Sequence, residues 1–373
     1  FSLSADQNYA SSQRALGLIY SEGKYIQPDE SKALHYLNLA ANQNDAIANS
    51  QLGSIYYEGK LVSYDINKAI HHFTLAANNY NPNAQFFLGF IYSNIKKDEQ
   101  KSIYYFTMAA NQSHKEAQKC LGIRYLLGDN KNIKKAIYYL TSSAEQHCVD
   151  SNFYLGVAYL EGVYVPRDYK KSIYFFKNAS SFNDEFSKNN LAIIYNNVMN
   201  KISFAIELLK EAINRKNDHL SMYNLAHIYF YNEQLKVNID NIIELLIKSL
   251  RFSFYPSFIL LSLVLIKKLP HHGINEIKSE LIRYGIQSSK IIYLILFAIY
   301  DNNLNDEKCY NSLFEIVKNE VYTYSYAYNE VSFARITSYN FEKLQEAYAE
   351  KIIIEDINDD FYEGFNSNKN NQN

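Results

Sequence analysis

The hydrophobic and polar residues of this chain form two patterns, both with helical spacing, which follow each other repeatedly along the sequence. One pattern includes ALGLIYSEGK at 15–24 and QLGSIYYEGK at 51–60, and the other includes SKALHYLNLAAN at 31–42 and NKAIHHFTLAAN at 67–78. Both place apolar residues at i, i+3, i+4 and i+7, which is the spacing of a helix buried along one stripe. The sequence therefore predicts pairs of amphipathic helices.

The first helix of each pair carries a leucine, a small residue directly after it and a tyrosine four positions after it. These leucines recur about every 33 to 36 residues: Leu16, Leu52, Leu88, Leu121, Leu155, Leu191 and Leu225. An eighth, eroded copy fits at Leu261, Ser262 and Leu265. A fixed period of this length indicates a solenoid of stacked helix pairs.

Small and polar residues mark the boundaries of the predicted helices. We expect the small residue after each leucine, such as Gly53 or Gly156, to let the second helix approach closely. Polar residues are placed to cap most second helices, namely Asp29, Asp65, Asp98, Asn132, Asp168 and Asn238. Glycines end four first helices, where a left-handed conformation is expected: Gly23, Gly59, Gly128 and Gly162.

Taken in this order and spacing, LG, Tyr, Gly, Asp, KA and AA resemble the Sel1-like repeat (SLR), a relative of the tetratricopeptide repeat. The resemblance covers about residues 1–269, and Ile95 departs from it where a glycine is usual. It implies an all-α fold, a right-handed α-solenoid (superhelix) of antiparallel helix pairs. Such stacks are quasi-one-dimensional, and their end repeats diverge so that they can face solvent.

The period also suggests how the chain is divided. Residues 1–8 align with the second helix at 73–80, so we expect the chain to start within a repeat and to continue a longer protein. Residues 1–269 form the predicted repeat array, 270–358 a predicted helical C-terminal cap, and 359–373 a polar tail that we expect to be disordered.

Composition narrows the classes of partner. Hydrophobic residues make up 47% of the 373-residue chain and charged residues 20%, and the net charge is -2. Because the chain has no excess of positive charge, nucleic acid is not expected as a partner. The longest apolar runs, Phe252–Ile266 and Ile291–Tyr300, are shorter than the roughly 18 to 20 residues that span a bilayer, and they predict buried helices.

Candidate chemistry is sparse. The cysteines Cys120, Cys148 and Cys309 form no metal or disulfide framework. His71–His72 falls at helix-packing positions of the repeat, and His271–His272 lacks further ligands at metal-binding spacing. No nucleotide-binding, metalloprotease, hydrolase or kinase motif occurs. The sequence predicts no enzyme activity, cofactor, metal or small-molecule substrate.

Protein binding is the function that remains. In stacks of this type the first helices line a concave face, so their outward residues are predicted to bind a partner protein or peptide. The predicted site consists of Arg14, Leu18, Phe86, Phe90, Lys119, Ile123, Phe153, Val157, Tyr223, His227 and Phe230. Phe90, Phe153 and Phe230 are expected to point into this groove, whereas Tyr56, Tyr125 and Tyr159 are expected to hold the repeats together.

The resulting interpretation is a cytoplasmic protein-interaction scaffold, or adaptor, that captures a helix or an extended segment. Two alternatives stay open. One is an ER-lumenal adaptor of a membrane ubiquitin ligase in ER-associated degradation, and the other is the regulatory repeat region of an enzyme such as a kinase. The sequence upstream of Phe1 would distinguish them.

Overall fold

The fold is described by a computed structural model, which covers residues 5, 7–23, 26–128, 131–216, 218–250, 256–268, 274–284, 322–324 and 331–333. The chain divides into two compact units. Unit 1 comprises residues 1–158 and 162–166, and unit 2 comprises 159–161 and 167–373. This division falls inside the predicted repeat array.

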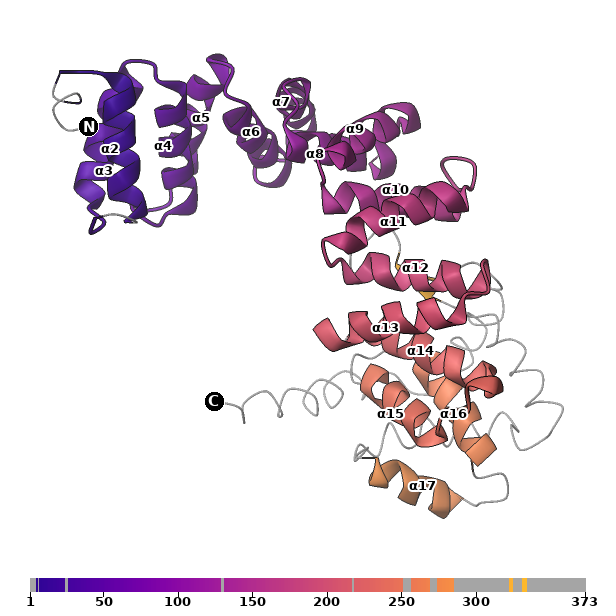
Figure 1. The fold of residues 1–373 in the computed structure, drawn as a ribbon. Helices are drawn as coiled ribbons and strands as arrows, with labels where there is room; N and C mark the ends of the chain where they lie inside the picture. The colour runs from indigo at the N-terminus through magenta and orange to yellow at the C-terminus, as the bar shows by residue number, and fades with distance from the viewer. Residues whose placement is uncertain are drawn as a thin grey trace. The chain divides into compact units, whose positions relative to one another are not determined.

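Helix pairs build both units, with the first member of a pair here called the A helix and the second the B helix (Figure 1). In unit 1 the A helices are α2 (Ala10–Glu22), α4 (Ala46–Glu58), α6 (Pro82–Asn94), α8 (Lys115–Leu127) and α10 (Val149–Glu161, whose last three residues belong to unit 2). The B helices of unit 1 are α3 (Glu30–Asn42), α5 (Ile66–Asn78), α7 (Glu99–Asn111) and α9 (Ile133–Glu145).

Unit 2 continues the alternation. Its B helices are α11 (Tyr169–Ser181), α13 (Ile202–Lys216) and α15 (Ile239–Leu250), and its A helices are α12 (Glu185–Asn197) and α14 (His219–Tyr231). The short 3-10 helix η1 (Glu233–Leu235) follows α14, and α16 (Pro256–Lys268) and α17 (Ile274–Arg283) follow α15. The eroded eighth copy thus forms a helix, α16. The predicted all-α solenoid of helix pairs is confirmed, and its right-handed sense stays a prediction.

One element departs from the expected helices. Residues Tyr322–Tyr324 (β1) and Val331–Phe333 (β2) form a two-stranded antiparallel sheet inside the region predicted to be a helical cap. Aromatic and β-branched residues, in which both segments are rich, favour strands over helices. Only α17 agrees with the predicted cap among the described residues of this region. His271–His272, Cys309 and the predicted disordered tail lie outside the described residues.

Within a repeat, the small residue of the A helix faces a large buried side chain of the B helix. A methyl group on Gly53 would lie 2.6 Å from Cδ1 of Phe73, and one on Gly122 would lie 2.6 Å from Cγ of Leu140. Because such distances are far below van der Waals contact, only a glycine fits this helix spacing. The expected close approach of the two helices is confirmed at these positions.

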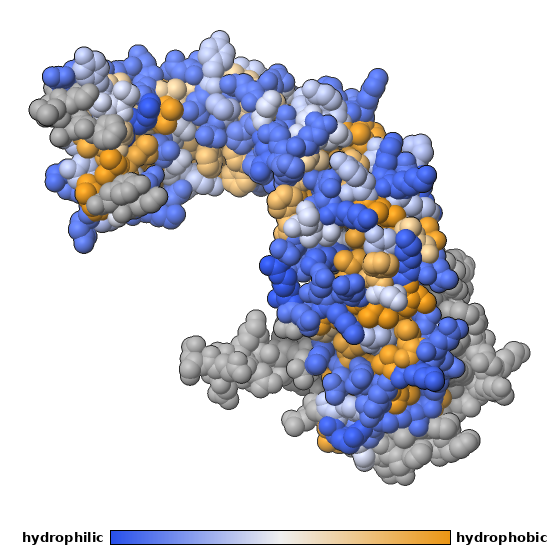
Figure 2. Space-filling model, viewed as in Figure 1, coloured by the Kyte–Doolittle hydropathy of each residue, from blue (hydrophilic) through white to orange (hydrophobic). Residues whose placement is uncertain are grey.

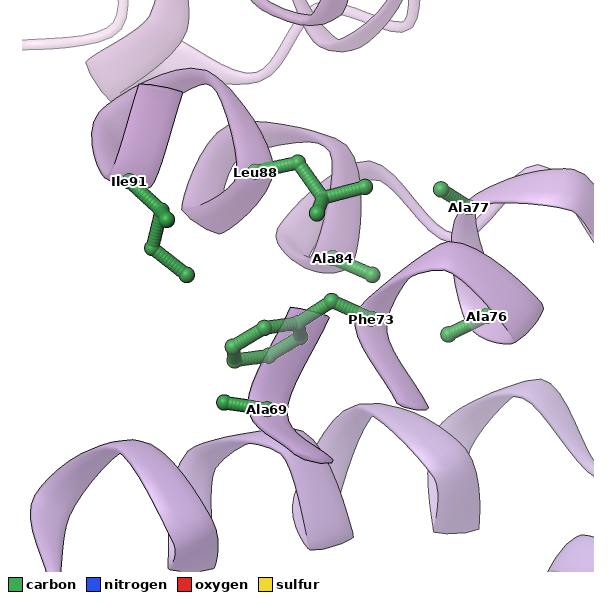
Figure 3. Packing of buried hydrophobic residues seen from close by; sticks show 7 residues of the cluster. All are labelled: Ala69, Phe73, Ala76, Ala77, Ala84, Leu88 and Ile91. Atoms are coloured by element: carbon green, nitrogen blue, oxygen red, sulfur yellow. The ribbon is translucent and has the colours of Figure 1, made fainter. Parts of the chain in front are cut away.

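Between repeats, each B helix packs on the next A helix. At the junction of α5 and α6, Phe73, Ala76 and Ala77 of α5 meet Ala84 and Leu88 of α6 in a cluster of buried residues (Figure 3). Phe73 therefore contacts both its own A helix and the following repeat. One aromatic side chain couples three helices, and burying it stabilises the array by about 1.5–3 kcal/mol.

The predicted caps form, with one exception among the glycines. The side chains of Asp29, Asp65, Asp98, Asn132 and Asp168 each accept a hydrogen bond from the first turn of a B helix, and Asn238 accepts one from the Asp240 N–H. Gly23, Gly59 and Gly162 are left-handed, with φ of 64°, 67° and 69°. Gly128 was predicted wrongly, since it is extended at φ -72° and ψ 174°. A side chain there would instead crowd the Arg124 carbonyl oxygen at 2.6 Å.

A buried amide, which the sequence analysis missed, joins five of the repeats to the preceding helix. It stands three residues before the anchoring leucine, and it donates to a backbone carbonyl in the last turn of the preceding B helix. Gln85 Nε2 lies 3.3 Å from the Ala77 oxygen, and Gln118 Nε2 lies 3.3 Å from the Ala110 oxygen. The same bond recurs in other repeats at Gln13, Asn49 and Asn152. The signal was the recurrence of Gln or Asn at one register position.

Candidate protein-binding face

The predicted binding residues, apart from Phe230, occupy two register positions on the A helices. We call the position two residues before the anchoring leucine the bridging position, and the one two residues after it the face position. Arg14, Phe86, Lys119, Phe153 and Tyr223 stand at the bridging position. Leu18, Phe90, Ile123, Val157 and His227 stand at the face position.

Three bridging residues of unit 1 contact the start of the next A helix. Arg14 Nη1 forms an ion pair of 2.6 Å with Oδ2 of Asp45, the N-cap of α4. Phe86 stacks on His114, the N-cap of α8, with ring centroids 4.9 Å apart. Lys119 Nζ lies 2.9 Å from Oδ2 of Asp150 in α10. These three side chains connect neighbouring repeats. They lie at the edge of the A helices and remain partly exposed to solvent.

Lys119 is held in its charged form. Burial lowers the pKa of its ammonium group, but hydrogen bonds and charge interactions with Glu116 and Asp150 outweigh burial and raise the pKa above the ordinary lysine value. The positive charge of Lys119 is therefore paired with two carboxylates of the protein itself. A structural role in joining α8 to α10 accounts for this residue.

At the face position, four successive A helices of unit 1 present side chains that are not fully buried. They are Leu18 on α2, Ser54 on α4, Phe90 on α6 and Ile123 on α8. Phe90 is 36% exposed and touches Phe86, with ring centroids 6.5 Å apart. Hydrophilic residues dominate the visible side of unit 1 in Figure 2, with small hydrophobic patches between them. We call these four residues the unit 1 face.

Five of the predicted residues are buried, so the expectation that they line an open groove is wrong. Phe153 and Val157 on α10 are fully buried, as is Tyr223 on α14, while His227 and Phe230 are 4% and 3% exposed. The prediction rested on the repeat register alone, and that register cannot reveal a segment that covers the A helices. In unit 2 such a segment exists, because β1 lies against α12 and α14.

The tyrosines of the A helices stack on the B helix of their own repeat. Tyr56 stacks on His72 with centroids 5.6 Å apart, and Tyr159 stacks on Phe175 at 5.9 Å. Tyr125 stacks on Tyr139 at 6.1 Å. Each pair joins the A and B helices of one repeat. Tyr56 and Tyr125 also pack against clusters of buried residues that span two repeats, and the role of the three tyrosines in holding repeats together stays a prediction. A lysine near the start of the B helix covers the tyrosine ring in each case, for example Lys68 at 5.1 Å from Tyr56.

His71 and His72 are packing residues. His72 lies between the Tyr56 ring and Asn49, whose Oδ1 is 3.1 Å from His72 Nδ1. Burial, with smaller contributions from the charges of His71 and Lys68, lowers the pKa of His72 to about 4. The imidazole is therefore neutral at pH 7. Among the described residues, no group of three or more His, Cys, Asp or Glu is arranged to hold a metal ion.

The described cysteines are also poorly suited to chemistry. Burial raises the pKa of the Cys120 thiol to about 11, which disfavours the reactive thiolate. Cys148 is buried and is the N-cap residue of α10. In the part of the chain that the structure describes, no helix has both the length and the hydrophobicity needed to cross a membrane.

Comparison with known proteins identifies the repeat. The Sel1 repeat family model matches residues 10–45, 46–81, 82–114, 116–148, 149–181 and 219–241. A Sel1 repeat protein from Oxalobacter formigenes is 26% identical, with a TM-score of 0.50 over 56% of this chain and 89% of that one. A protective antigen of uropathogenic Escherichia coli with an SLR fold is 19% identical, with a TM-score of 0.49 over 84% of this chain and 76% of that one. No curated protein matches the chain.

Proposed function

The chain belongs to the Sel1 repeat family, and from this premise we propose that it is a non-enzymatic scaffold whose unit 1 face binds a segment of a partner protein. Sel1 repeats generally serve as protein-interaction scaffolds. The observation that carries the proposal is the unit 1 face itself: three of its four residues are apolar, and none is fully buried.

The chemistry of the unit 1 face suggests the kind of segment it takes. Leu18, Phe90 and Ile123 carry no charge, and the charges nearby at Arg14 and Lys119 are paired within the protein. An amphipathic helix or an extended segment with spaced apolar side chains fits such a surface, because its apolar residues gain most from contact with these side chains. Aromatic anchors of this kind often dominate binding energy, so we expect Phe90 to contribute most.

The test compares two sets of substitutions. The triple variant Leu18→Ala, Phe90→Ala and Ile123→Ala removes the apolar unit 1 face. The control, Tyr104→Ala with Tyr138→Ala, removes two aromatic rings from B helices, where they are 59% and 65% exposed. Proteins captured from native lysate by the wild type are purified and then titrated against both variants.

Loss of the unit 1 face should weaken binding by at least tenfold, because a hot-spot residue contributes more than about 1–2 kcal/mol. The melting temperature should stay close to that of the wild type, since the residues are not part of the core. The proposal fails if the control weakens binding as much as the triple variant, or if the triple variant binds as the wild type does.

Location belongs to the same proposal. We place the scaffold in the cytoplasm, with the ER lumen as the alternative, and a fluorescent fusion of the full-length protein distinguishes the two. No observation on the described residues favours the ubiquitin-ligase adaptor or the kinase-associated role.

A further inference from the structure

At the face position, the A helices α10, α12 and α14 are buried, whereas α2, α4, α6 and α8 are accessible. At the face position, Ile193 of α12 is 5% exposed and His227 of α14 is 4% exposed, whereas Phe90 of α6 is 36% exposed. At the bridging position, Asn189 and Tyr223 are fully buried. The same repeat register therefore gives an accessible face position in α2 to α8 and a buried one in α10, α12 and α14.

The helix α16 gives an independent sign that unit 2 is covered on more than one side. Leu260, Leu261, Leu263, Val264 and Leu265 are all fully buried. Together with Ser262, which is also fully buried, these residues point around most of the circumference of the helix, and a helix buried this widely must be enclosed on more than one side. Contacts on a single side of α16 would leave part of this circumference in water.

The strand β1 is a described element that lies against A helices of unit 2. It lies against both α12 and α14, although a long stretch of chain separates it from α14 in sequence. It pairs with β2 in an antiparallel register in which Thr323 is opposite Ser332. An extended segment of the chain's own C-terminal region thus rests on two successive A helices.

We propose that the surface of α12 and α14 is a docking site for an extended segment, and that the β1–β2 strand pair of the same chain, here called the hairpin, is its resident occupant. In the free protein this hairpin closes the A helices of unit 2 to partner segments. A partner that binds there must displace the hairpin. The apparent affinity of the partner equals its intrinsic affinity multiplied by the fraction of molecules in which the hairpin has left. The unit 1 face stays available throughout.

The absence of tryptophan from the chain makes this proposal directly measurable. The substitution Tyr223→Trp places a single indole, the α14 reporter, at the bridging position of α14. The substitution Tyr104→Trp places one, the α7 reporter, at an exposed position of α7 as the reference. Each is measured in the full chain with and without Thr323→Pro, which removes a backbone donor from β1 and disfavours strand pairing. Emission wavelength and acrylamide quenching report how far water reaches the indole.

We expect the α14 reporter to be shielded in the parent chain and to shift to longer wavelength, with stronger quenching, when Thr323→Pro is added. The α7 reporter should be unaffected by Thr323→Pro. A synthetic peptide of residues 320–335 should restore the shielding of the α14 reporter in the Thr323→Pro chain, and a scrambled peptide should not. Identical signals from the α14 reporter with and without Thr323→Pro would overturn the proposal.

A second pair of reporters keeps the test decisive if Tyr223→Trp disturbs the fold. Tyr322→Trp and Thr323→Trp place the indole within β1 on opposite sides of the strand, because successive strand residues face opposite ways. One of the two should be shielded relative to the α7 reporter. If both are as accessible as the α7 reporter, the hairpin does not rest on unit 2. None of these measurements involves a partner, so their outcome is separate from that of the unit 1 face.

Discussion

Replacing Gly53 with alanine should destabilise the second helix pair through a single contact. The added methyl group would lie 2.6, 2.7 and 2.8 Å from the Cδ1, Cε1 and Cγ atoms of Phe73, whereas ordinary contact begins at 3.4 Å. The Phe73 ring cannot move aside easily, because it is fully buried against Ala84 and Leu88 of the next repeat. Helices α4 and α5 must therefore separate, and this movement also disturbs the junction with α6.

Two effects of opposite sign set the magnitude. Overpacking of a core contact costs about 1–3 kcal/mol, and alanine is favoured over glycine within a helix by about 1 kcal/mol. The difference is a fall of up to about 2 kcal/mol in the free energy of unfolding on Gly53→Ala. In a Phe73→Ala background the clash is gone, so the same substitution should raise that free energy by about 1 kcal/mol. The sign of the effect should reverse.

The assay is a double-mutant cycle by urea denaturation, with hydrogen exchange of the α4 and α5 amides as a local measure. Local exchange is needed because a repeat array can unfold in parts. Ser54→Ala, one residue further along α4, is the control and should change stability by less than about 0.5 kcal/mol. If Gly53→Ala stabilises both backgrounds equally, helix propensity explains the result and the close approach does not matter.

Two further predictions concern buried polar groups. The pKa of His72 is about 4 in the folded chain against an ordinary 6.5, so the folded chain holds the neutral form and the unfolded chain takes up the proton first. The free energy of unfolding should therefore fall as pH drops from about 6.5 to about 4, by about 1–2 kcal/mol after allowance for partial exposure, and His72→Phe should remove this part of the pH dependence. Gln85→Leu should cost about 1–3 kcal/mol in urea denaturation, because the Ala77 carbonyl and the Gln112 amide lose their partner. Gln85→Asn should cost less, since asparagine makes the same bond at position 49; equal losses for both variants would contradict the proposed role of the amide.

The repeat architecture could be predicted because its determinants are local and recur. The leucine, the small residue and the capping aspartate each act within one helix pair, and seven copies of the pattern make the register unambiguous. Predictions failed where one copy used a different local solution. Gly128 follows the same sequence pattern as Gly59, yet its backbone is extended. A glycine is required there because a Cβ atom would crowd the Arg124 carbonyl oxygen, and not because φ is positive.

The candidate site was only partly predictable, because exposure is not a local property. The register placed accessible side chains at the face position of α2, α4, α6 and α8, but it failed at Phe153 and Val157 of α10, which are fully buried. It could not reveal that a strand near residue 322 lies against α12 and α14, or that Ile193 and His227 on these helices are buried. The sequence did hold one indication. The apolar run at 252–266 is hydrophobic on every side of its helix, and such a helix needs more covering than its neighbours in a repeat stack provide.

These observations separate two questions that a repeat sequence tends to merge, namely what stabilises the array and what is left to bind. Arg14, Phe86 and Lys119 are charged or aromatic residues at the edge of A helices, yet each is used in a contact with the next repeat. Substituting them would lower stability and binding together, and such a result would not locate a partner. Phe90 differs because its exposed surface lies outside these contacts, so it can be changed without opening a junction between repeats. A binding surface in this family is therefore better sought at positions that neither the helix pair, nor the next repeat, nor the chain's own C-terminal hairpin already covers.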